Sequence, residues 1–585
     1  MIRRVLIANR GEIALRIIRA CRELGIESVA VHSDADARAP HTLAADRAVA
    51  IGPAPASESY LSIPRVIEAA TSSEADAIHP GYGFLSENAG FAEACAQAGI
   101  IFVGPPASVI TTMGSKIAAR GIAGAAGVPV VPGQTPGDQS DAGVTVAVER
   151  VGLPALIKAS AGGGGRGMRV VREAGEVAGA VQAARREATA AFGDGTLYVE
   201  RLIETPHHVE VQIFADGHGA VMHLFERECS VQRRHQKVIE ESPSPMLTPG
   251  LRARVTGAAV AVARSAGYRN AGTIEFIVDL SGKGGDAAPF YFLEMNTRLQ
   301  VEHPVTEQVT GLDLVRAQLL VASGEPLPWT QASVCQRGHA IEARVYAEDP
   351  ARGFIPQAGR LVQYHEPHLP GVRIDSGVAE GSEVTVYYDP LIAKVIATAE
   401  SRPLAIGRLA AALRAFSVGG IRTNLPFLVR ILELDAFRDG RIDTGFLDRE
   451  GAALATSLPV ESPISNPQSL TPLRGPLPPG PVNPQLMDPW NGVPSRSASI
   501  RPGPTGRRAR SAGVGQLVLT APMPATVLKV PVKPGDTVKK GEVVVLLEAM
   551  KMELPIRAPS DAIVAAVVCR EGELVQADAT LVELK

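Results

Sequence analysis

The sequence contains little cysteine and has no strong net charge. Its five cysteines lie far apart and form no Cys-x-x-Cys pair, which indicates reduced thiols in a cytoplasmic protein and argues against a structural zinc site. A formal net charge of -3 and a pI near 6.5 provide no bulk positive field, so we expect no general nucleic-acid binding.

Long hydrophobic runs are also absent. No stretch of 18 consecutive apolar residues occurs, so we expect no membrane span. The chain starts with Met1-Ile2-Arg3-Arg4 and soon carries Asn9, Arg10 and Glu12, a pattern unlike that of a signal peptide. At 585 residues the chain is too long for one hydrophobic core, which predicts several domains.

The N-terminal part alternates predicted strands and helices. Residues 5–8 and 28–31 are short apolar runs, and the helix expected between them carries Ile13, Ile17 and Leu24 on one face. This alternation is typical of a parallel α/β sheet, Rossmann-like in outline. No Gly-x-Gly-x-x-Gly follows the first strand, so dinucleotide binding is not supported.

Two loops are unusually rich in turn residues. Residues 79–88 follow a strand and could be only a tight structural turn. Residues 161–168 follow Lys158, which we place at the end of a strand over residues 155–157. Four consecutive glycines supply no side chain for packing and cost backbone entropy, so a loop whose N–H groups fold over phosphates explains them better. The loop lacks the closing Gly-Lys-Ser/Thr of a Walker A motif, and a mobile linker is the alternative.

Acidic residues interrupt two apolar strands. Glu275 lies in the run 272–276, and Glu294 lies in the run 290–296, which ends at Asn296. A buried carboxylate is costly unless it is paired or binds a metal. Two carboxylates and an amide oxygen suit magnesium shared with nucleotide phosphates. The basic cluster 231–237 lies upstream and could be no more than a solvated charged strand.

The C-terminal part contains an internal repeat with a lysine at its centre. Lys551 follows the apolar run 543–547, and a shift of 37 residues places Ala521 on Ala558 and Val527 on Val564. Two copies of one β unit predict a pseudo-symmetric sandwich. Lys551 then lies on an exposed turn between two strands. The alternatives are an ordinary surface lysine and a lipoyl domain of the same fold.

These motifs resemble biotin carboxylase, an ATP-grasp enzyme, along residues 1–447, and the Ala-Met-Lys-Met motif resembles the biotinyl domain of biotin-dependent carboxylases. One departure is a longer, glycine-rich hairpin over residues 281–289, which we expect to lengthen a surface turn only. The resemblance implies an α/β and α+β fold with a Rossmann-like N-terminal domain (1–114), an ATP-grasp domain with a glycine-rich lid (115–330), an α+β C-terminal carboxylase domain (336–447), a proline-rich flexible linker (451–513) and an all-β biotinyl sandwich (514–585).

The resemblance also implies roles for individual residues. The implied ATP site consists of Lys116, Lys158, Gly162, Gly163, Gly164, Gly165, Gly167, Glu200, Leu202, His208, Gln232 and His235. The implied ligands of Mg²⁺ or Mn²⁺ are Glu275, Glu294 and Asn296, and the implied bicarbonate pocket contains Lys237, Arg298, Gln300 and Val301. Glu302 corresponds to the general base and Arg344 to the arginine that stabilises the biotin enolate. Lys551 corresponds to the lysine that carries biotin.

The predicted linker and the missing domains point to a partner. Residues 451–513 contain 13 of the 45 prolines, and as a flexible coil they would span roughly 45 Å, or roughly 195 Å in extended polyproline form. No carboxyltransferase domain and no docking β-barrel are recognisable. The organisation resembles the α subunit of bacterial, particularly actinobacterial, acyl-CoA carboxylases. It implies a separate carboxyltransferase β subunit, a biotin protein ligase and a homo-oligomeric core in a large complex.

Rival functions differ in what they require of the sequence. Another ATP-grasp ligase would share residues 115–330 without needing Lys551, and a non-catalytic biotin carrier would not keep Lys237, Glu302 and Arg344. Within the carboxylases, acetyl-CoA and propionyl-CoA are the favoured acceptors. The alternatives are 3-methylcrotonyl-CoA, longer acyl-CoAs and pyruvate.

Overall fold

The computed structural model describes residues 2–160, 167–282, 284–456, 517–550 and 552–585. The chain folds into two compact units. The first, here called the large unit, includes the described residues up to 456 together with Ala549 and Met550, and the C-terminal unit includes the other described residues from 517 on. Each unit is described by itself.

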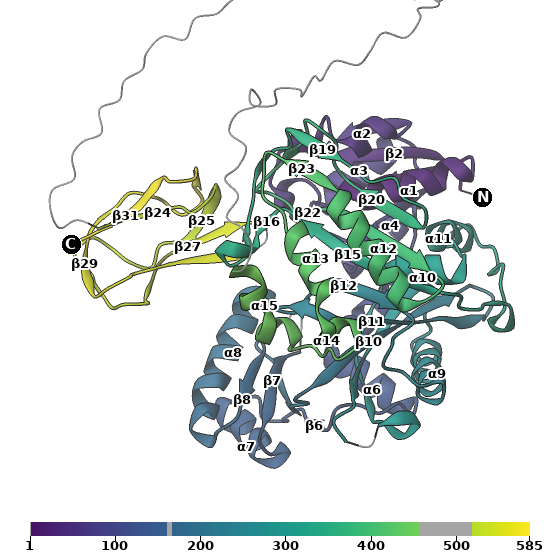
Figure 1. Ribbon diagram of the computed structural model, residues 1–585, viewed down its shortest axis with the longest axis horizontal. Coiled ribbons are helices and arrows are strands. Elements are labelled where there is room, and N and C mark those ends of the chain that lie inside the picture. Colours follow the sequence, from purple (N-terminus) through teal and green to yellow (C-terminus); the bar gives the residue numbers. More distant parts are fainter. Residues whose placement is uncertain (1, 161–166, 283, 457–516, 551) are drawn as a thin grey trace, which may run out of the picture. The chain divides into compact units, whose positions relative to one another are not determined.

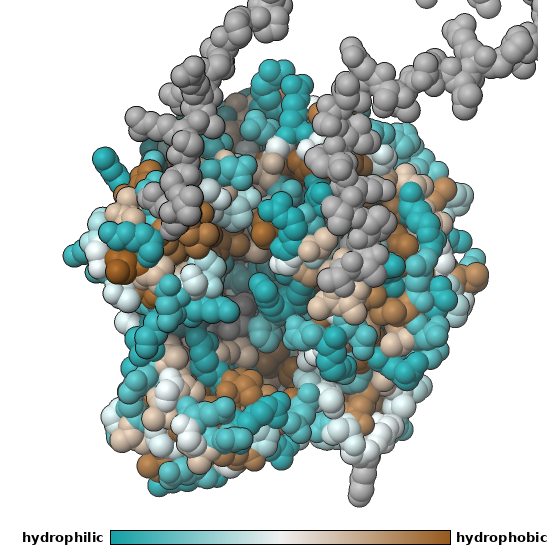
Figure 2. Space-filling model, turned by 60° about the vertical axis from the view of Figure 1, so that its left-hand side comes forward, coloured by the Kyte–Doolittle hydropathy of each residue, from teal (hydrophilic) through white to brown (hydrophobic). Residues whose placement is uncertain are grey.

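Within the described ranges, every helix is too short or too polar to cross a membrane. On the face shown in Figure 2, hydrophobic residues occur in small groups separated by hydrophilic ones.

A five-stranded parallel sheet forms the N-terminal part of the large unit (Figure 1), with strand order β3-β2-β1-β4-β5. This confirms the predicted Rossmann-like α/β architecture. Ile13 and Ile17 are buried against the sheet as expected, and Leu24 is half-buried. The elements are β1 (Arg4–Ile7), α1 (Gly11–Glu23), β2 (Glu27–His32), α2 (Pro40–Ala44), β3 (Arg47–Ala50), α3 (Ile63–Ser72), β4 (Ala77–His79), α4 (Ala89–Gln97) and β5 (Ile101–Phe102).

A smaller antiparallel sheet with strand order β6-β9-β7-β8 follows. Helices α7 and α8 bury their apolar sides against it. The strand containing Lys158 continues to Ala159, so this lysine lies inside the strand and not at its end. The elements are α5 (Ala107–Gly114), α6 (Lys116–Ala125), β6 (Gly133–Gln134), α7 (Asp141–Val151), β7 (Ala155–Ala159), β8 (Arg169–Val171), α8 (Val177–Phe192) and β9 (Leu197–Arg201).

An eight-stranded antiparallel sheet with order β14-β13-β10-β11-β12-β15-β22-β20 runs through the large unit. Because β12 pairs with β15, the sheet continues across the predicted domain boundary near residues 330–336. Its strands are β10 (Pro206–Ala215), β11 (Val221–Arg233), β12 (Gln236–Ser242), β13 (Asn270–Asp279), β14 (Phe290–Asn296), β15 (His339–Tyr346), β20 (Val372–Ser376) and β22 (Leu391–Ala399).

Helices cover this sheet (Figure 1): α9 packs on β10 and β11, α10 on β15, and α12 on β22 and β15. Helix α15 ends at Thr456, so the first residues of the predicted linker are helical, and the rest of it lies outside the described residues. The helices are α9 (Pro249–Ser265), α10 (His303–Thr310), α11 (Leu314–Ala322), α12 (Arg402–Ala415), α13 (Leu425–Glu433), α14 (Asp435–Arg438) and α15 (Phe446–Thr456).

The structure corrects the sequence expectation for one hairpin and agrees with it for another. The basic cluster 231–237 is no continuous strand, because Arg234 and His235 form the turn between β11 and β12 with positive φ angles of 49° and 65°. The longer hairpin between β13 and β14 is a surface turn as predicted. It is held to the start of α9 by a 2.5 Å hydrogen bond from the Thr248 hydroxyl to Asp286.

The C-terminal unit is a sandwich of two four-stranded sheets, as the repeat predicts. A shift of 37 residues, the separation of Ala521 from Ala558, places β25 on β29, β26 on β30, β27 on β31 and β24 on part of β28. The two sheet orders, β24-β31-β29-β26 and β28-β27-β25-β30, correspond under this shift. The strands are β24 (Leu517–Thr520), β25 (Ala525–Lys529), β26 (Thr537–Val538), β27 (Val543–Ala549), β28 (Met552–Arg557), β29 (Ala562–Val567), β30 (Leu574–Val575) and β31 (Thr580–Leu584).

Candidate active site

One cavity of about 660 Å³ in the large unit collects most of the predicted site residues. The predicted residues that line it are Lys116, Lys158, Glu200, Leu202, His208, Gln232, His235, Lys237, Glu275, Glu294, Asn296, Arg298, Gln300, Val301, Glu302 and Arg344. Gly162, Gly163, Gly164, Gly165 and Lys551 lie outside the described residues. Residues more than two hundred positions apart thus meet in one site, because the sheets bring their strands together.

Gly167 is not among the lining residues, although it was predicted in the nucleotide site. Its φ angle is +69°, and a Cβ atom there would lie 2.9 Å from that of Ala159. Its carbonyl accepts a 3.1 Å hydrogen bond from the Ala159 N–H. Gly167 therefore fixes the end of the glycine segment against β7, next to Lys158.

One end of the cavity holds two lysines around a buried acid. The Lys158 ammonium lies 2.5 Å from the Glu200 carboxylate, and Arg120 also donates to Glu200. Lys116 begins α6 beside this pair, and burial lowers its pKa. Three cations around one carboxylate leave net positive charge, which suits a phosphate group.

The same end of the cavity offers apolar surface. Leu202, Ile203 and Leu293 line it, together with Gln232 and the ring of His235. Burial lowers the pKa of His235, which favours the neutral imidazole. An apolar slot with a few polar groups beside clustered cations fits a planar base attached to phosphates.

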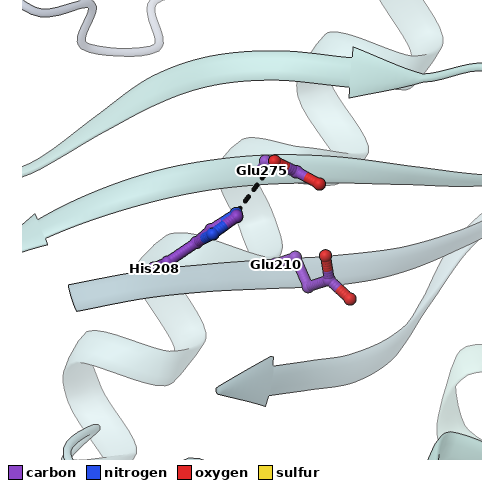
Figure 3. A group of neighbouring side chains, drawn as sticks. All are labelled: His208, Glu210 and Glu275. Atoms are coloured by element: carbon purple, nitrogen blue, oxygen red, sulfur yellow. Dashed lines mark hydrogen bonds and ion pairs between the residues drawn. The ribbon is translucent and has the colours of Figure 1, made fainter. Parts of the chain in front are cut away.

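The floor of the cavity is acidic. Glu275 on β13 accepts hydrogen bonds from Asn296 (2.8 Å) and Gln300 (3.1 Å) and pairs with His208 (2.8 Å) and Lys237 (3.1 Å). Burial alone would raise the pKa of Glu275, but Lys237 and His208 hold it well below its usual range. Figure 3 shows His208 projecting from β10 toward Glu275 on the neighbouring strand, with Glu210 on the same strand as His208.

Glu294 lies opposite Glu275 on the adjacent strand β14. Burial and the charge of Glu275 raise the pKa of Glu294, and no ion pair of Glu294 forms among the described residues. Asn296 is the third predicted ligand, and its carbonyl oxygen accepts a 3.1 Å hydrogen bond from Arg298. Two facing carboxylates and an amide oxygen are hard ligands that fit Mg²⁺.

A second geometric grouping brings ligand atoms of His208, Glu210 and Glu275 within 4.8 Å of one another. Glu210 in this group is already paired with Arg227 and Lys237, both at 2.5 Å. Its charge is therefore compensated by two direct ion pairs, whereas Glu294 has only the more distant Lys116 and Lys158 to offset its charge. The predicted set of Glu275, Glu294 and Asn296 remains the better candidate for a divalent cation.

Glu302 occupies the opposite end of the cavity between two cations. Its carboxylate lies 2.6 Å from Lys237 and 2.9 Å from Arg344. Burial alone would raise the pKa of Glu302, but Lys237, Arg344 and Arg227 hold it well below its usual range. Arg344 also pairs with Glu240. The side chain is therefore a buried, ionised carboxylate held in a fixed direction.

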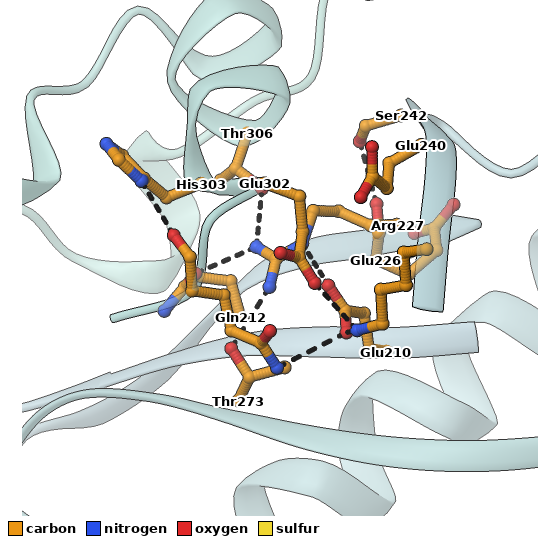
Figure 4. Close-up of polar contacts among 12 residues, drawn as sticks. Glu210, Gln212, Glu226, Arg227, Glu240, Ser242, Thr273, Glu302, His303 and Thr306 are labelled. Carbon is orange, nitrogen blue, oxygen red and sulfur yellow. Dashed lines mark hydrogen bonds and ion pairs between the residues drawn. The ribbon is translucent and has the colours of Figure 1, made fainter. Parts of the chain in front are cut away.

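Sequence reasoning missed the support beneath these groups. Arg227 is fully buried and donates to Glu210, Gln212 (2.8 Å), Thr273 (3.0 Å) and Thr306 (3.1 Å), as Figure 4 shows. Glu210 interrupts the apolar strand β10 just as Glu275 interrupts β13. The criterion that identified Glu275 and Glu294 would have found it as well.

The loop over residues 79–88 supports Arg298, one of the residues that line the cavity. Glu87 accepts a 2.8 Å hydrogen bond from the Arg298 guanidinium and a 3.1 Å bond from the Thr297 N–H. The loop is therefore more than a structural turn, because it holds Arg298 from the N-terminal sheet. No sequence signal singled out Glu87 within this loop.

Comparison with known families divides the chain into four matched segments. Residues 1–110 match "Biotin carboxylase, N-terminal domain", residues 115–330 match "Carbamoyl-phosphate synthase L chain, ATP binding domain", and residues 342–449 match "Biotin carboxylase C-terminal domain". Residues 517–584 match "Biotin-requiring enzyme".

Individual relatives agree with these matches. The chain is 53% identical over 449 residues to Biotin carboxylase 2 of Bacillus subtilis, covering 76% of this chain and 99% of that protein. It is 51% identical over 447 residues to the mitochondrial methylcrotonoyl-CoA carboxylase subunit alpha of soybean (Glycine max), covering 76% of this chain but only 60% of that protein.

A solved structure shares the fold of the large unit. The biotin carboxylase domain dimer of Hydrogenobacter thermophilus 2-oxoglutarate carboxylase, in complex with MgADP, ADP and bicarbonate, is 43% identical, with a TM-score of 0.74. The similarity covers 78% of this chain and 99% of that domain. High identity over nearly the full length of the Bacillus protein, the domain matches and the shared fold establish that the chain belongs to the biotin carboxylase family.

Proposed function

We propose that the chain carboxylates biotin with ATP and bicarbonate and passes the carboxyl group to a separate carboxyltransferase subunit. The observation that carries this proposal is the Glu302 carboxylate held between Lys237 and Arg344 in the same cavity as the acidic floor. Such a cavity combines a base, anion-binding cations and a divalent cation site within reach of one another.

The nucleotide is assigned to the end of the cavity with Lys116, Lys158 and Glu200. The two lysines would bind phosphate oxygens, and the apolar slot at Leu202 would hold the base. Mg²⁺ bound at Glu275, Glu294 and Asn296 would neutralise phosphate charge, which is the main requirement of phosphoryl transfer. The Hydrogenobacter domain binds MgADP and bicarbonate, which supports carrying these ligands over to this chain.

Glu302 is assigned the proton transfer. It would take the proton of bicarbonate while the bicarbonate oxygen attacks the γ-phosphorus of ATP, giving carboxyphosphate and ADP. The low pKa of Glu302 reflects its two cations. A bicarbonate ion bound beside Lys237 would compete for the ammonium and so raise the basicity of Glu302 at the time of transfer.

Carboxyphosphate would then break down to CO2 and phosphate inside the cavity. Phosphate accepts a proton from biotin, and Arg344 is placed to offset the negative charge that develops on that ring. A closed site protects carboxyphosphate from water. Biotin attached to Lys551 is the acceptor, and the chain would work in the cytoplasm, in keeping with its five free cysteines.

The carboxyltransferase subunit would select the acyl acceptor. We propose that this acceptor is acetyl-CoA or propionyl-CoA. Support comes from the chain organisation: only residues 450–516 separate the carboxylase and biotin-requiring matches. A second candidate is 3-methylcrotonyl-CoA, which the 51% identity to the soybean subunit favours. The large unit is similar to enzymes with different acceptors, so its sequence discriminates weakly between them.

The experiment is fixation of labelled bicarbonate by the complex recovered from its native cells on an avidin-type resin. Acetyl-CoA, propionyl-CoA, 3-methylcrotonyl-CoA and pyruvate would be offered in turn. Label in acetyl- or propionyl-CoA supports the proposed acceptor, and label in 3-methylcrotonyl-CoA supports the second candidate. Biotin-dependent ATP hydrolysis with no label in any acyl-CoA would overturn the acyl-CoA assignment.

A further inference from the structure

The backbone between β14 and α10 forms the bicarbonate end of the cavity, yet it belongs to neither element. Asn296 ends β14 and His303 begins α10, so no strand ladder holds the residues between them. Gln300, Val301 and Glu302 all line the cavity from this connection. Within it the backbone supplies one long hydrogen bond, 3.3 Å from the His303 N–H to the Gln300 carbonyl, so side chains must fix the direction of the remaining groups.

Side chains hold three consecutive carbonyl groups of this connection. The Leu299 carbonyl accepts a 3.2 Å hydrogen bond from the Arg298 guanidinium. The Gln300 carbonyl accepts a 2.7 Å bond from Nδ1 of His303, and the Val301 carbonyl accepts a 2.9 Å bond from the Lys394 ammonium. A carbonyl can only accept, so Nδ1 of His303 carries the proton.

The direction of these carbonyls fixes the direction of the next N–H group. A trans peptide is planar, with its C=O and N–H pointing opposite ways. Because the Gln300 carbonyl points to His303, the Val301 N–H points away from it. No described residue accepts a hydrogen bond from the Val301 N–H, and Val301 lines the cavity. The N–H is therefore available to an anion there.

Lys394 reaches the connection from β22, where it lies directly opposite Arg344 of β15 and Asp375 of β20. Neighbouring residues of an antiparallel pair project from the same face of the sheet. Lys394 thus holds the carbonyl of Val301, while its neighbour Arg344 holds the carboxylate of Glu302. Two adjacent cations fix two consecutive residues.

The charged groups around Lys394 and His303 keep the lysine protonated and the imidazole neutral. Lys394 is fully buried, and its ammonium lies 3.2 Å from Glu12 and 3.9 Å from Asp375. Burial alone would lower the pKa of Lys394, but the charges of Glu12, Glu342 and Asp375 raise it. His303 is fully buried. Burial and the charges of Lys394, Arg16 and Arg373 hold its pKa well below its usual range, so its ring is neutral. Figure 4 shows His303 directly after Glu302.

We propose that His303 and Lys394 are positioning residues that fix the Gln300–Glu302 backbone, so that the Val301 N–H and the Glu302 carboxylate face the bicarbonate ion together. This inference rests on the proposed carboxylase function. Neither residue touches the cavity as a lining group, so each acts through the peptide that it holds.

The test measures bicarbonate-dependent ATP hydrolysis with free biotin in the full chain. His303→Leu and Lys394→Met remove the two donors. Each should raise the KM for bicarbonate about 10-fold or more, the usual effect of one lost charged or buried hydrogen bond, with the KM for ATP changed less than about 2-fold. His303→Asn keeps an N–H donor near the position of Nδ1 and should restore most of the bicarbonate KM.

Thr398→Val is the matched control, because Thr398 also lies on β22 and donates to Gln308 of α10 (3.0 Å) without contacting residues 300–302. It should leave the bicarbonate KM unchanged. A purely structural role would lower the melting temperature and the active fraction, and hence kcat, without moving this KM. Should His303→Leu fail to fold, His303→Gln replaces it, since its longer side chain moves the amide away from the Gln300 carbonyl.

The positioning role and the proposed function are overturned by different results. An unchanged bicarbonate KM in folded, ATP-binding His303→Leu and Lys394→Met proteins overturns the positioning role, while the wild type still carboxylates biotin. A wild-type chain without any bicarbonate-dependent ATP hydrolysis overturns the proposed function instead.

Discussion

The Lys237 ammonium lies 2.6 Å from the Glu302 carboxylate in the cavity of the large unit, beside two further buried acids. Glu210 and Glu275 share the same ammonium, at 2.5 Å and 3.1 Å. Burial alone would lower the pKa of Lys237, but Glu210, Glu275 and Glu302 raise it well above its usual value. One cation thus joins the acidic floor to the base, and removal of either partner should affect both.

Glu302→Gln should lower kcat for carboxylation of free biotin by roughly 10²- to 10⁴-fold, the usual contribution of a general base. The amide keeps the size of the side chain but cannot accept a proton. The measurement is ATP-dependent incorporation of labelled bicarbonate, and a melting curve checks that the variant folds. A near-wild-type kcat would remove Glu302 from this role.

Lys551→Ala should abolish carboxylation of the chain itself and leave carboxylation of free biotin intact, because the residues that line the cavity all lie between positions 116 and 448 and free biotin needs no attachment lysine. Lys540→Ala is the control, since Lys540 is an exposed lysine only eleven positions earlier in the chain. Both variants are assayed with and without free biotin. Loss of activity on free biotin in Lys551→Ala would contradict the assignment of the chemistry to the cavity and of biotin attachment to Lys551.

Glu294→Gln should raise the Mg²⁺ concentration needed for half-maximal ATP hydrolysis by roughly 10-fold or more, because changes around a bound metal commonly cost that much affinity. Removal of one of two facing carboxylates weakens the cation site directly. An exposed acid, Glu325→Gln, serves as the control. If both variants titrate with Mg²⁺ like the wild type, Glu294 is no ligand.

Glu348→Gln should become more stable relative to the wild type as the pH rises. Glu348 is buried and 2.7 Å from Arg233; burial raises its pKa from 4.5 to about 7, although Arg233 opposes the shift. The native state therefore keeps the proton between about pH 4.5 and 7, where the unfolded chain has lost it. The contribution of Glu348 to the free energy of unfolding therefore falls as the pH rises through that window. The loss reaches about 3 kcal/mol, because each pH unit lowers the contribution by about 1.36 kcal/mol.

Glutamine resembles the protonated acid and does not titrate. Melting curves of the wild type and of Glu348→Gln at pH 5 and pH 8 measure the change. The exposed substitution Glu380→Gln provides the control and should show no pH-dependent difference. An equal offset between Glu348→Gln and the wild type at both pH values would contradict the raised pKa.

Much of this architecture could be predicted because its signals are local. The strand over residues 290–296 is β14 with the predicted bounds, and the shift of 37 residues corresponds to the two sheets of the C-terminal unit. Apolar runs, turn residues and repeats depend on neighbours in sequence, so they can be read without knowing the fold. Residues identified through the family resemblance also gathered in one cavity.

The support of the site could not be predicted in this way. Lys394 lies in β22, but its partner is the Val301 carbonyl, 93 residues earlier in the chain. Glu87 and Arg298 are 211 residues apart. Such contacts arise only when sheets and loops come together in space. Glu210 could have been predicted, because an acidic residue within an apolar strand is a local signal in the sequence.

The central claim is that this chain alone transfers the carboxyl group of bicarbonate to its own biotin at the cost of ATP. The most direct test incubates the purified, biotinylated chain with ATP, Mg²⁺ and labelled bicarbonate, and then measures acid-labile label on the protein. The account predicts label that requires both ATP and Lys551, with one ADP formed for each carboxyl group fixed. ATP hydrolysis that is indifferent to bicarbonate, with no label on the chain, would contradict it.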